Sequence, residues 1–120
     1  MVITTLRIMA PPEKRDEIPK TFRSIVGPTR IKPGCISSHV FVDLEDANAL
    51  SMVEEWETEA DLNSHVSSRE YTKLLALLDM SSEPPEISFK KVLSSSGLDA
   101  VKAVRKETMQ KRVVGFSERR

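Results

Sequence analysis

The order of strand-like and helix-like segments constrains this chain more than any single motif. Strands are predicted at residues 2–9, 35–44, 50–57 and 86–93, where β-branched and apolar residues recur between polar ones. Residues 45–48 form a turn that is short enough to make the second and third strands an antiparallel pair. Helical patterns fill the two long intervals between strands, so the predicted order is β-α-β-β-α-β.

The first helix is predicted over residues 13–32, with early acidic residues that suit the helix dipole. Its apolar stripe is Ile18, Phe22, Ile25 and Val26. The Gly27-Pro28 pair predicts a kink or break, because proline lacks a backbone donor and crowds the preceding turn.

The second helical region is predicted in two pieces. Thr58 and Asp61 form an N-cap pair that opens a short helix ending near Val66. Ser67 and Glu70 have the spacing of a capping box, which predicts a new helix from there to Met80. The inward residues of that helix are predicted to be Tyr71, Leu74, Leu75 and Leu78.

These elements predict an α+β fold of the ferredoxin-like kind, in which a four-stranded antiparallel sheet carries its helices on one face. Within the second strand, Ile36, Val40, Val42 and Leu44 are predicted to share one face, and Cys35, Ser37, His39, Phe41 and Asp43 the other. In the third strand, Leu50, Met52, Glu54 and Trp56 share a face.

Apolar residues at or near the open face are expected to be Phe41, Trp56, Phe89 and Leu93. An apolar sheet surface of this kind predicts a homodimer joined through the sheets.

Charge separates a main domain, residues 1–93, from a linker and basic helical tail, residues 94–120. The first part holds 11 Lys/Arg and 15 Asp/Glu, and the second holds 7 and 3, so their net charges are −4 and +4. The tail is predicted to be helical from Leu98 to Arg112 and to dock on its own body or on the dimer mate. Leu98, Val101 and Val104 would face inward. A solvated helix is favoured over a nucleic-acid contact.

The whole chain has no net charge and a single cysteine, Cys35. It shows neither the pattern of a secretory signal nor an apolar run as long as a membrane span. These features predict a cytoplasmic protein with no nucleic-acid and no membrane partner.

Three motifs together resemble the antibiotic biosynthesis monooxygenase family over about residues 1–93. They are Glu54-Glu55-Trp56-Glu57-Thr58 followed by Ala60 to His65, the Ser-rich break with an aromatic at Ser67 to Tyr71, and Pro33-Gly34-Cys35-Ile36. The resemblance implies a dimeric α/β barrel. It also implies oxidation of a quinol, an anthrone or a related small aromatic by molecular oxygen, with no metal and no flavin. Other members degrade haem or act on small signalling molecules.

His65 matches the histidine of that family and is the candidate catalytic base, because histidine titrates near neutral pH. The candidate substrate-binding residues are Trp56, Tyr71, His39, Glu54 and Arg69. A pocket between sheet and helices, bordered by Trp56, His65 and Tyr71, is predicted. Each residue also has a structural interpretation: His65 as a helix-end histidine that packs on Trp56 and bonds to backbone, Trp56 as a core anchor, Glu54 as the partner of Arg7, His39 at a surface or dimer interface, and Tyr71 and Arg69 at an exposed helix start.

No metal and no cofactor are predicted. Two histidines 26 positions apart and one cysteine give no zinc spacing. Haem-degrading relatives use an early asparagine, a helical tryptophan and a later histidine, whereas this chain has no asparagine before Asn48 and no histidine after His65. The alternative function is a non-catalytic dimeric module that binds a small apolar ligand, or a stress protein of the same fold.

Overall fold

Four antiparallel strands form one sheet in the order β2-β3-β1-β4 in the computed structural model of the chain. The model describes the backbone of residues 1–118 and the side chains of residues 1–112. The strands are β1 (Val2–Met9), β2 (Cys35–Val42), β3 (Ala49–Trp56) and β4 (Glu86–Lys91). Because β1 and β3 are central, they contribute most of the buried strand residues.

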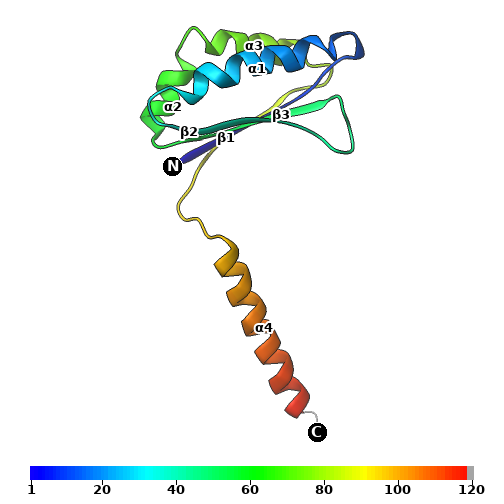
Figure 1. Ribbon diagram of the computed structural model, residues 1–120, viewed down its shortest axis with the longest axis vertical. Coiled ribbons are helices and arrows are strands. Elements are labelled where there is room, and N and C mark those ends of the chain that lie inside the picture. The colour runs from blue at the N-terminus through cyan, green and yellow to red at the C-terminus, as the bar shows by residue number, and fades with distance from the viewer. Residues whose placement is uncertain (119–120) are drawn as a thin grey trace.

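The helices of the body, α1 (Glu17–Arg30), α2 (Glu59–Val66) and α3 (Tyr71–Met80), all lie on one face of this sheet, as Figure 1 shows. A short 3-10 helix, η1 (Pro12–Lys14), precedes α1, and α4 (Leu98–Glu118) follows β4. The predicted β-α-β-β-α-β order and α+β ferredoxin-like fold are therefore confirmed. None of the helices described is long and apolar enough to cross a membrane.

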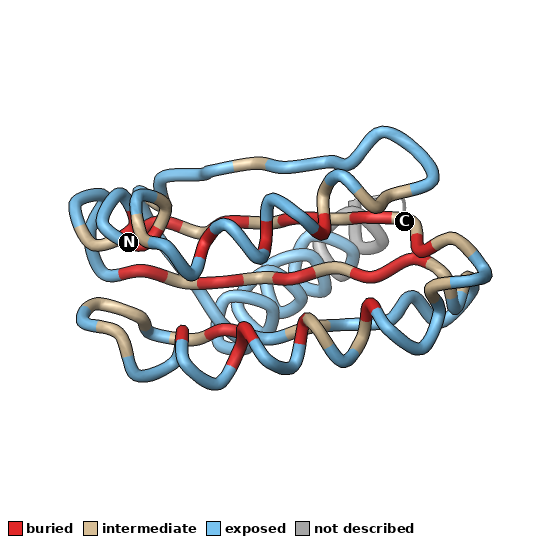
Figure 2. Tube along the Cα trace, turned by 90° about the horizontal axis from the view of Figure 1, so that it is seen from above, coloured by how far each residue is buried: buried red, intermediate tan, exposed pale blue. Residues whose placement is uncertain are grey.

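The core lies between the sheet and the three helices (Figure 2). The prediction that Leu50, Met52, Glu54 and Trp56 share one face of β3 is confirmed, since all four are buried. The main cluster joins β1, β3, α1 and α3, and a smaller one gathers Val2 and Leu62 around Trp56. Trp56 thus anchors the end of the core where α2 crosses the sheet.

The first helix is shorter at its start and more continuous than predicted. It begins at Glu17 because Pro12–Lys14 forms the separate η1 turn. It continues through Gly27 and Pro28 to Arg30, so the expected break was wrong. Pro28 lies within the last turn, and its missing N–H leaves only one carbonyl without its helical hydrogen bond. The Thr29 hydroxyl donates to the Ile25 carbonyl at 2.7 Å and helps to hold this turn.

A β-bulge reverses part of the predicted pattern of β2. The register shifts between Cys35 and Ser37, so that Cys35 pairs with Trp56 while Ser37 pairs with Glu55. Cys35 therefore packs on the Trp56 cluster under the helices, and Ile36 is exposed. The prediction that Ile36 shares a face with Val40, and Cys35 with Ser37, was wrong. One inserted residue in a strand moves the residues before it to the opposite face of the sheet.

The capping box predicted at Ser67 and Glu70 was also wrong. Ser67 is the C-cap of α2, and α3 begins at Tyr71 without a side-chain cap. The Glu70 carboxylate instead pairs with Lys32. In α3, Tyr71, Leu74 and Leu77 are buried, whereas the predicted inward Leu75 is exposed. The Thr58 N-cap was predicted correctly, since its hydroxyl accepts from the Asp61 backbone N–H at 3.1 Å.

Not all of the four apolar residues predicted at or near the open face of the sheet lie there. Phe41 pairs with Ser51 there and is 53% exposed. Trp56 is instead buried beneath the helices. Phe89 pairs with Thr4, whose side chain is buried on the helix side, so Phe89 lies at the β4 edge of that side. Leu93 lies beyond the end of β4.

Helix α4 projects away from the body, as Figure 1 shows. Leu98, Val101 and Val104, the residues predicted to face inward, are 67%, 54% and 62% exposed. The predicted docking of the tail on its own body was therefore wrong. The apolar stripe is thin, and exposed ion pairs contribute only about 0–1 kcal/mol each, so neither holds the helix down.

Candidate functional site

The His65 ring is buried between two aromatic side chains. It stacks on Trp56, with ring centroids 4.8 Å apart and planes at 26°, and it meets the Tyr71 ring nearly edge-on at 5.3 Å. Trp56 ends the central strand β3, His65 lies in the last turn of α2, and Tyr71 opens α3. The structure thus brings these three predicted residues together on the helix side of the sheet.

Glu54 lies beside this aromatic cluster and is 1% exposed. Its Oε1 lies 3.6 Å from Nε2 of His65, and its Oε2 accepts from the Ser38 hydroxyl at 2.9 Å. Burial raises the pKa of the Glu54 carboxyl, and the Ser38 hydroxyl, the Trp56 indole N–H and the Lys32 charge oppose that rise. Arg7, the partner suggested by sequence, instead pairs with Asp43 at 3.4 Å.

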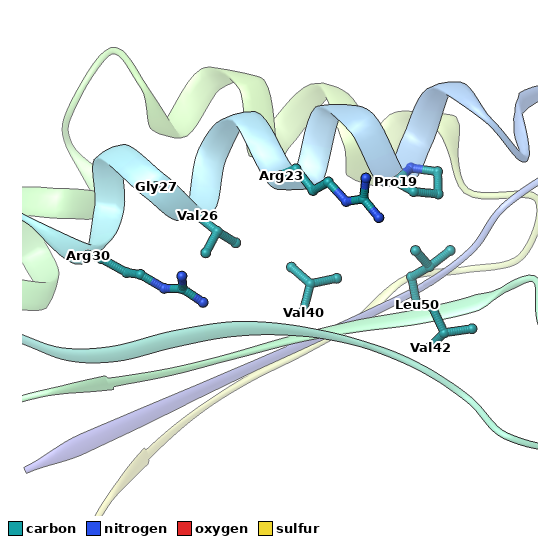
Figure 3. A pocket seen from close by; sticks show the side chains of 8 residues that line it. All are labelled: Pro19, Arg23, Val26, Gly27, Arg30, Val40, Val42 and Leu50. Carbon is teal, nitrogen blue, oxygen red and sulfur yellow. The ribbon is translucent and has the colours of Figure 1, made fainter.

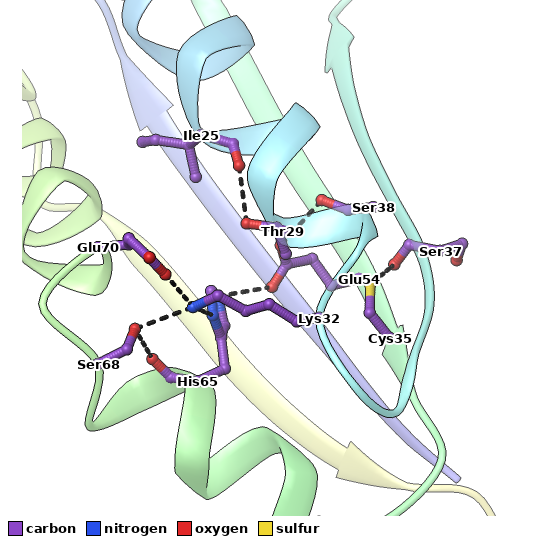
Figure 4. Close-up of polar contacts among 10 residues, drawn as sticks. All are labelled: Ile25, Thr29, Lys32, Cys35, Ser37, Ser38, Glu54, His65, Ser68 and Glu70. Carbon is purple, nitrogen blue, oxygen red and sulfur yellow. Dashed lines mark hydrogen bonds and ion pairs between the residues drawn. The ribbon is translucent and has the colours of Figure 1, made fainter.

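Lys32 is the residue of this cluster that sequence reasoning missed. Its Nζ lies 3.0 Å from Nδ1 of His65 and 3.0 Å from the Ser68 hydroxyl, and it pairs with the Glu70 carboxylate (Figure 4). Backbone hydrogen bonds from Lys32 N–H to Thr29 and from Cys35 N–H to the Lys32 carbonyl hold the turn that presents it. No local pattern links residues 33 positions apart, so only the fold reveals this contact.

The Lys32 contact fixes the protonation of His65. An ammonium group can only donate, so Nδ1 accepts and the hydrogen of the neutral ring lies on Nε2, toward Glu54. Burial, aided by the Lys32 charge and opposed by Glu70, lowers the pKa of His65 to about 4. His65 is therefore neutral near pH 7.

Two polar ring atoms in the cluster lack a hydrogen-bond partner among the described residues. They are Nε1 of Trp56 and Nε2 of His65, both fully buried. A buried donor without an acceptor is uncommon, because it loses its bond to water and gains none in return. Both lie toward the Glu54 carboxylate, whose Oε1 is 3.6 Å from Nε2 of His65 and whose pKa the Trp56 indole lowers, so this buried carboxylate is their acceptor at longer range.

A pocket of about 310 Å³ opens at this cluster, at the lower end of the size range of small-molecule sites. Its lining comes from the turn after α1, from the end of β3 and from α2: Lys32, Pro33, Trp56, Asp61, Ser64 and His65. Tyr71 lies behind His65 and instead lines, with Glu54, a cavity of about 10 Å³ on the β1 side. That smaller space has room for about one water molecule.

The remaining predicted residues lie outside this pocket. His39 is exposed in β2, with its Nδ1 3.2 Å from a terminal nitrogen of Arg30. Arg69 is exposed in the connection between α2 and α3. The partly buried Cys35 thiol is free, and burial raises its pKa, which disfavours the reactive thiolate.

A second, larger hollow of about 390 Å³ lies between α1 and the β2 edge of the sheet (Figure 3). Its floor is apolar, with Val26, Val40, Val42 and Leu50, and Arg23 and Arg30 extend beside it. Arg30 is held in place by its bond from Nε to the Ser38 carbonyl at 2.9 Å. Within the described part of the chain, no three His, Cys, Asp or Glu side chains are grouped as metal ligands would be.

Comparison with known proteins agrees with this architecture. The sequence model of the family described as Antibiotic biosynthesis monooxygenase matches residues 1–77. An uncharacterized protein of Synechocystis is 24% identical over 98 residues, which are 81% of this chain and 67% of that protein.

Solved structures with the same fold include one named antibiotic biosynthesis monooxygenase, with a TM-score of 0.71 and 22% identity over 78% of this chain and 100% of that one. A protein of Mycobacterium tuberculosis has a TM-score of 0.72 and 20% identity over 80% and 98% of the two chains. A conserved protein of Methanosarcina mazei has a TM-score of 0.69 and 27% identity over 75% and 90%.

Proposed function

Because the chain belongs to the antibiotic biosynthesis monooxygenase family, we propose that it is a cofactor-independent monooxygenase that oxidises a small aromatic, a quinol or an anthrone, with molecular oxygen. The observation that carries the proposal is the buried His65 ring, which stacks on Trp56, lines a 310 Å³ pocket with it and has the Glu54 carboxylate beside its Nε2. A pocket of this volume suits a small aromatic substrate.

The proposed chemistry asks the protein for a dry site and a proton acceptor. Loss of a proton from an aromatic hydroxyl or an activated methylene gives an electron-rich anion that can pass an electron to oxygen. For a quinol, the balance is quinol plus O₂ to hydroxyquinone plus water, so the substrate supplies all the electrons. His65 is the proposed base, and Trp56 supplies an aromatic surface for the ring.

We also propose that the working unit is a homodimer joined through the open sheet faces, in the cytoplasm, with residues 1–93 as the domain and residues 94–120 as an appended tail. Phe41, half exposed on that face, supports the dimer proposal. In such a dimer, α4 would be free to lie against the partner, since it does not pack on its own body.

Oxygen uptake by purified, chelator-treated protein tests the function. A panel of quinols and anthrones should be consumed with oxygen faster than in buffer, and His65→Ala should lower turnover by roughly 10²–10⁴-fold, the usual effect of losing a general base. His39→Ala is the matched control, because it removes the histidine outside the pocket. If no substrate stimulates uptake, or if both variants behave alike, the proposed reaction is wrong.

The groove between α1 and β2 favours a second candidate function, binding of a small apolar anion without catalysis. An apolar floor beside two guanidinium groups suits a ligand with a ring or chain and one acidic group. A fluorescent anilinonaphthalene sulfonate should then bind wild-type protein, and Val40→Trp, which fills the groove, should abolish that binding. Binding that survives Val40→Trp would exclude the groove as the ligand site.

A further inference from the structure

The proposed reaction leaves Lys32 without a role, although Lys32 lies between the pocket and the candidate base. Its ammonium group has three hydrogens and three partners: Nδ1 of His65, the Ser68 hydroxyl and the Glu70 carboxylate. The side chain is only 19% exposed and also lines the pocket. Because the Lys32 ammonium group occupies Nδ1 of His65 and lines the same pocket, a ligand there competes with His65 for this group.

We propose that Lys32 is the residue that stabilises the anionic oxygen of the substrate, by transferring to that oxygen the hydrogen bond it now gives to His65. The inference deepens the proposed function and rests on it. It defines the substrate as an aromatic hydroxyl compound that is held as its anion once its proton has moved to His65, and it assigns Lys32 direct contact with the reacting oxygen.

The charges around the pocket support this assignment. Among the described residues that line it, Lys32 is the one cation, and Asp61 is the one carboxylate. Asp61 is turned to the α2 N-cap, where its Oδ2 accepts from the Thr58 hydroxyl at 2.7 Å. Glu54 and Glu70, the other carboxylates near His65, would repel an anion, so an anion is bound only if it contacts Lys32.

The proton can be followed atom by atom. When a Lys32 hydrogen turns to the substrate oxygen, the Nδ1 lone pair of His65 becomes free. The O–H bond of the substrate breaks, its electron pair stays on oxygen, and the proton bonds to Nδ1. The ring then carries hydrogens on both nitrogens, and its Nε2–H faces the Glu54 carboxylate at 3.6 Å. Total charge is conserved, and the anion formed has Lys32 and the imidazolium as its neighbours.

This exchange also explains how a ring with a low pKa can accept a proton. In the resting protein the Lys32 charge and burial both disfavour the imidazolium. A substrate anion beside Lys32 offsets the positive charge of Lys32, and its own negative charge favours the His65 imidazolium. His65 therefore becomes basic only when substrate is present. Lys32 thereby suppresses proton uptake by His65 in the empty site.

A redox-inert phenol tests the inference without oxygenase activity. 4-Nitrophenol ionises near neutral pH and only its anion is strongly yellow, so absorbance reports which form is bound. Wild-type protein should bind the anion in preference to the phenol. Lys32→Met, which keeps the length of the side chain, should weaken anion binding roughly 10- to 100-fold, the usual effect of losing a hydrogen bond to a charged group. Lys32→Arg should retain part of it. Lys20→Met, on the exposed side of α1, removes the same charge as a control.

Nitrogen NMR of His65 gives a second readout, which checks the resting contact between Lys32 and Nδ1 from which the proposal starts. In wild-type protein Nδ1 should be unprotonated and Nε2 protonated. Lys32→Met should raise the pKa of His65, and Lys32→Arg should keep it low, which also covers the case in which the methionine variant folds poorly. Equal anion binding by Lys32→Met and wild type, or no anion binding by wild type, overturns the inference. Failure of oxygen uptake with intact anion binding instead overturns only the proposed reaction.

Discussion

Acid should destabilise the folded protein through His65, and the size of this effect follows from the burial of its ring. In the folded chain the pKa of His65 is lowered to about 4, whereas in the unfolded chain it is near 6.5. Stability due to the neutral buried ring is therefore fully present above pH 6.5 and is lost as the pH falls from 6.5 to about 4. The difference between these two pKa values corresponds to about 3 kcal/mol. Since small domains unfold with about 5–15 kcal/mol, this loss would be large.

Glu54 acts in the opposite direction and has to be separated from His65. Burial raises its pKa, so folded Glu54 takes up a proton at a higher pH than unfolded Glu54, and protonation there favours the folded state. The wild-type profile is a sum of both effects. The difference between wild-type protein and His65→Asn isolates the histidine, because Asn retains an acceptor near the position of Nδ1 but does not titrate.

Urea unfolding at a series of pH values from about 7.5 to about 4 measures this difference. The stability advantage of wild-type protein over His65→Asn should shrink by about 3 kcal/mol over that range. His39→Asn is the matched control, because it makes the same substitution at the exposed histidine. An advantage that is constant with pH would refute the argument that burial keeps His65 neutral.

Three further predictions concern the turn before β2, the open sheet face and the tail. Gly34 has φ +80° and a Cβ there would overlap the Asp61 side chain, so Gly34→Ala should lower the unfolding free energy by about 2 kcal/mol. Gly27→Ala, with nothing near its Cβ, should instead raise it by about 0.5–1 kcal/mol, and equal effects would contradict the reasoning. Phe41→Glu should shift sedimentation equilibrium toward monomer at micromolar concentration, whereas Leu75→Glu on the helix side should not; a stable wild-type monomer would rule out the dimer. Removal of residues 97–120 should leave the melting temperature of a monomeric variant unchanged, and a clear fall would show that α4 packs on the body after all.

The parts of the fold that sequence predicted well depend on strong, local periodicity. β3 is a central strand whose alternate residues are buried, so spacing alone showed that Glu54 and Trp56 share a face with Leu50 and Met52, although Trp56 was expected near the open side of the sheet. The Thr58 N-cap was equally local, because the residues that it joins are three positions apart. Both signals are contained in a window of a few residues.

The parts that were missed depend on contacts that no window contains. The bulge at Cys35 and Ser37 shifts the face of β2, and the Pro33-Gly34 pair before it indicates a turn but not an inserted residue. Glu70 had the spacing of a capping residue but pairs with Lys32, which is far away in sequence. The same distance hid the role of Lys32 at Nδ1 of His65, so the resemblance could suggest the histidine but not its protonation state.

The projecting helix α4 changes how this protein would behave in a sizing column. A helix of 21 residues is about 32 Å long, and it extends from a body to which it adds little bulk. The radius of gyration of the chain is 20.1 Å, whereas about 14 Å is expected of a compact chain of this length. A single chain would therefore have the hydrodynamic radius of a much heavier compact protein, and it would elute early. Its elution volume would resemble that of a compact dimer, so subunits should be counted by mass, with light scattering or sedimentation equilibrium.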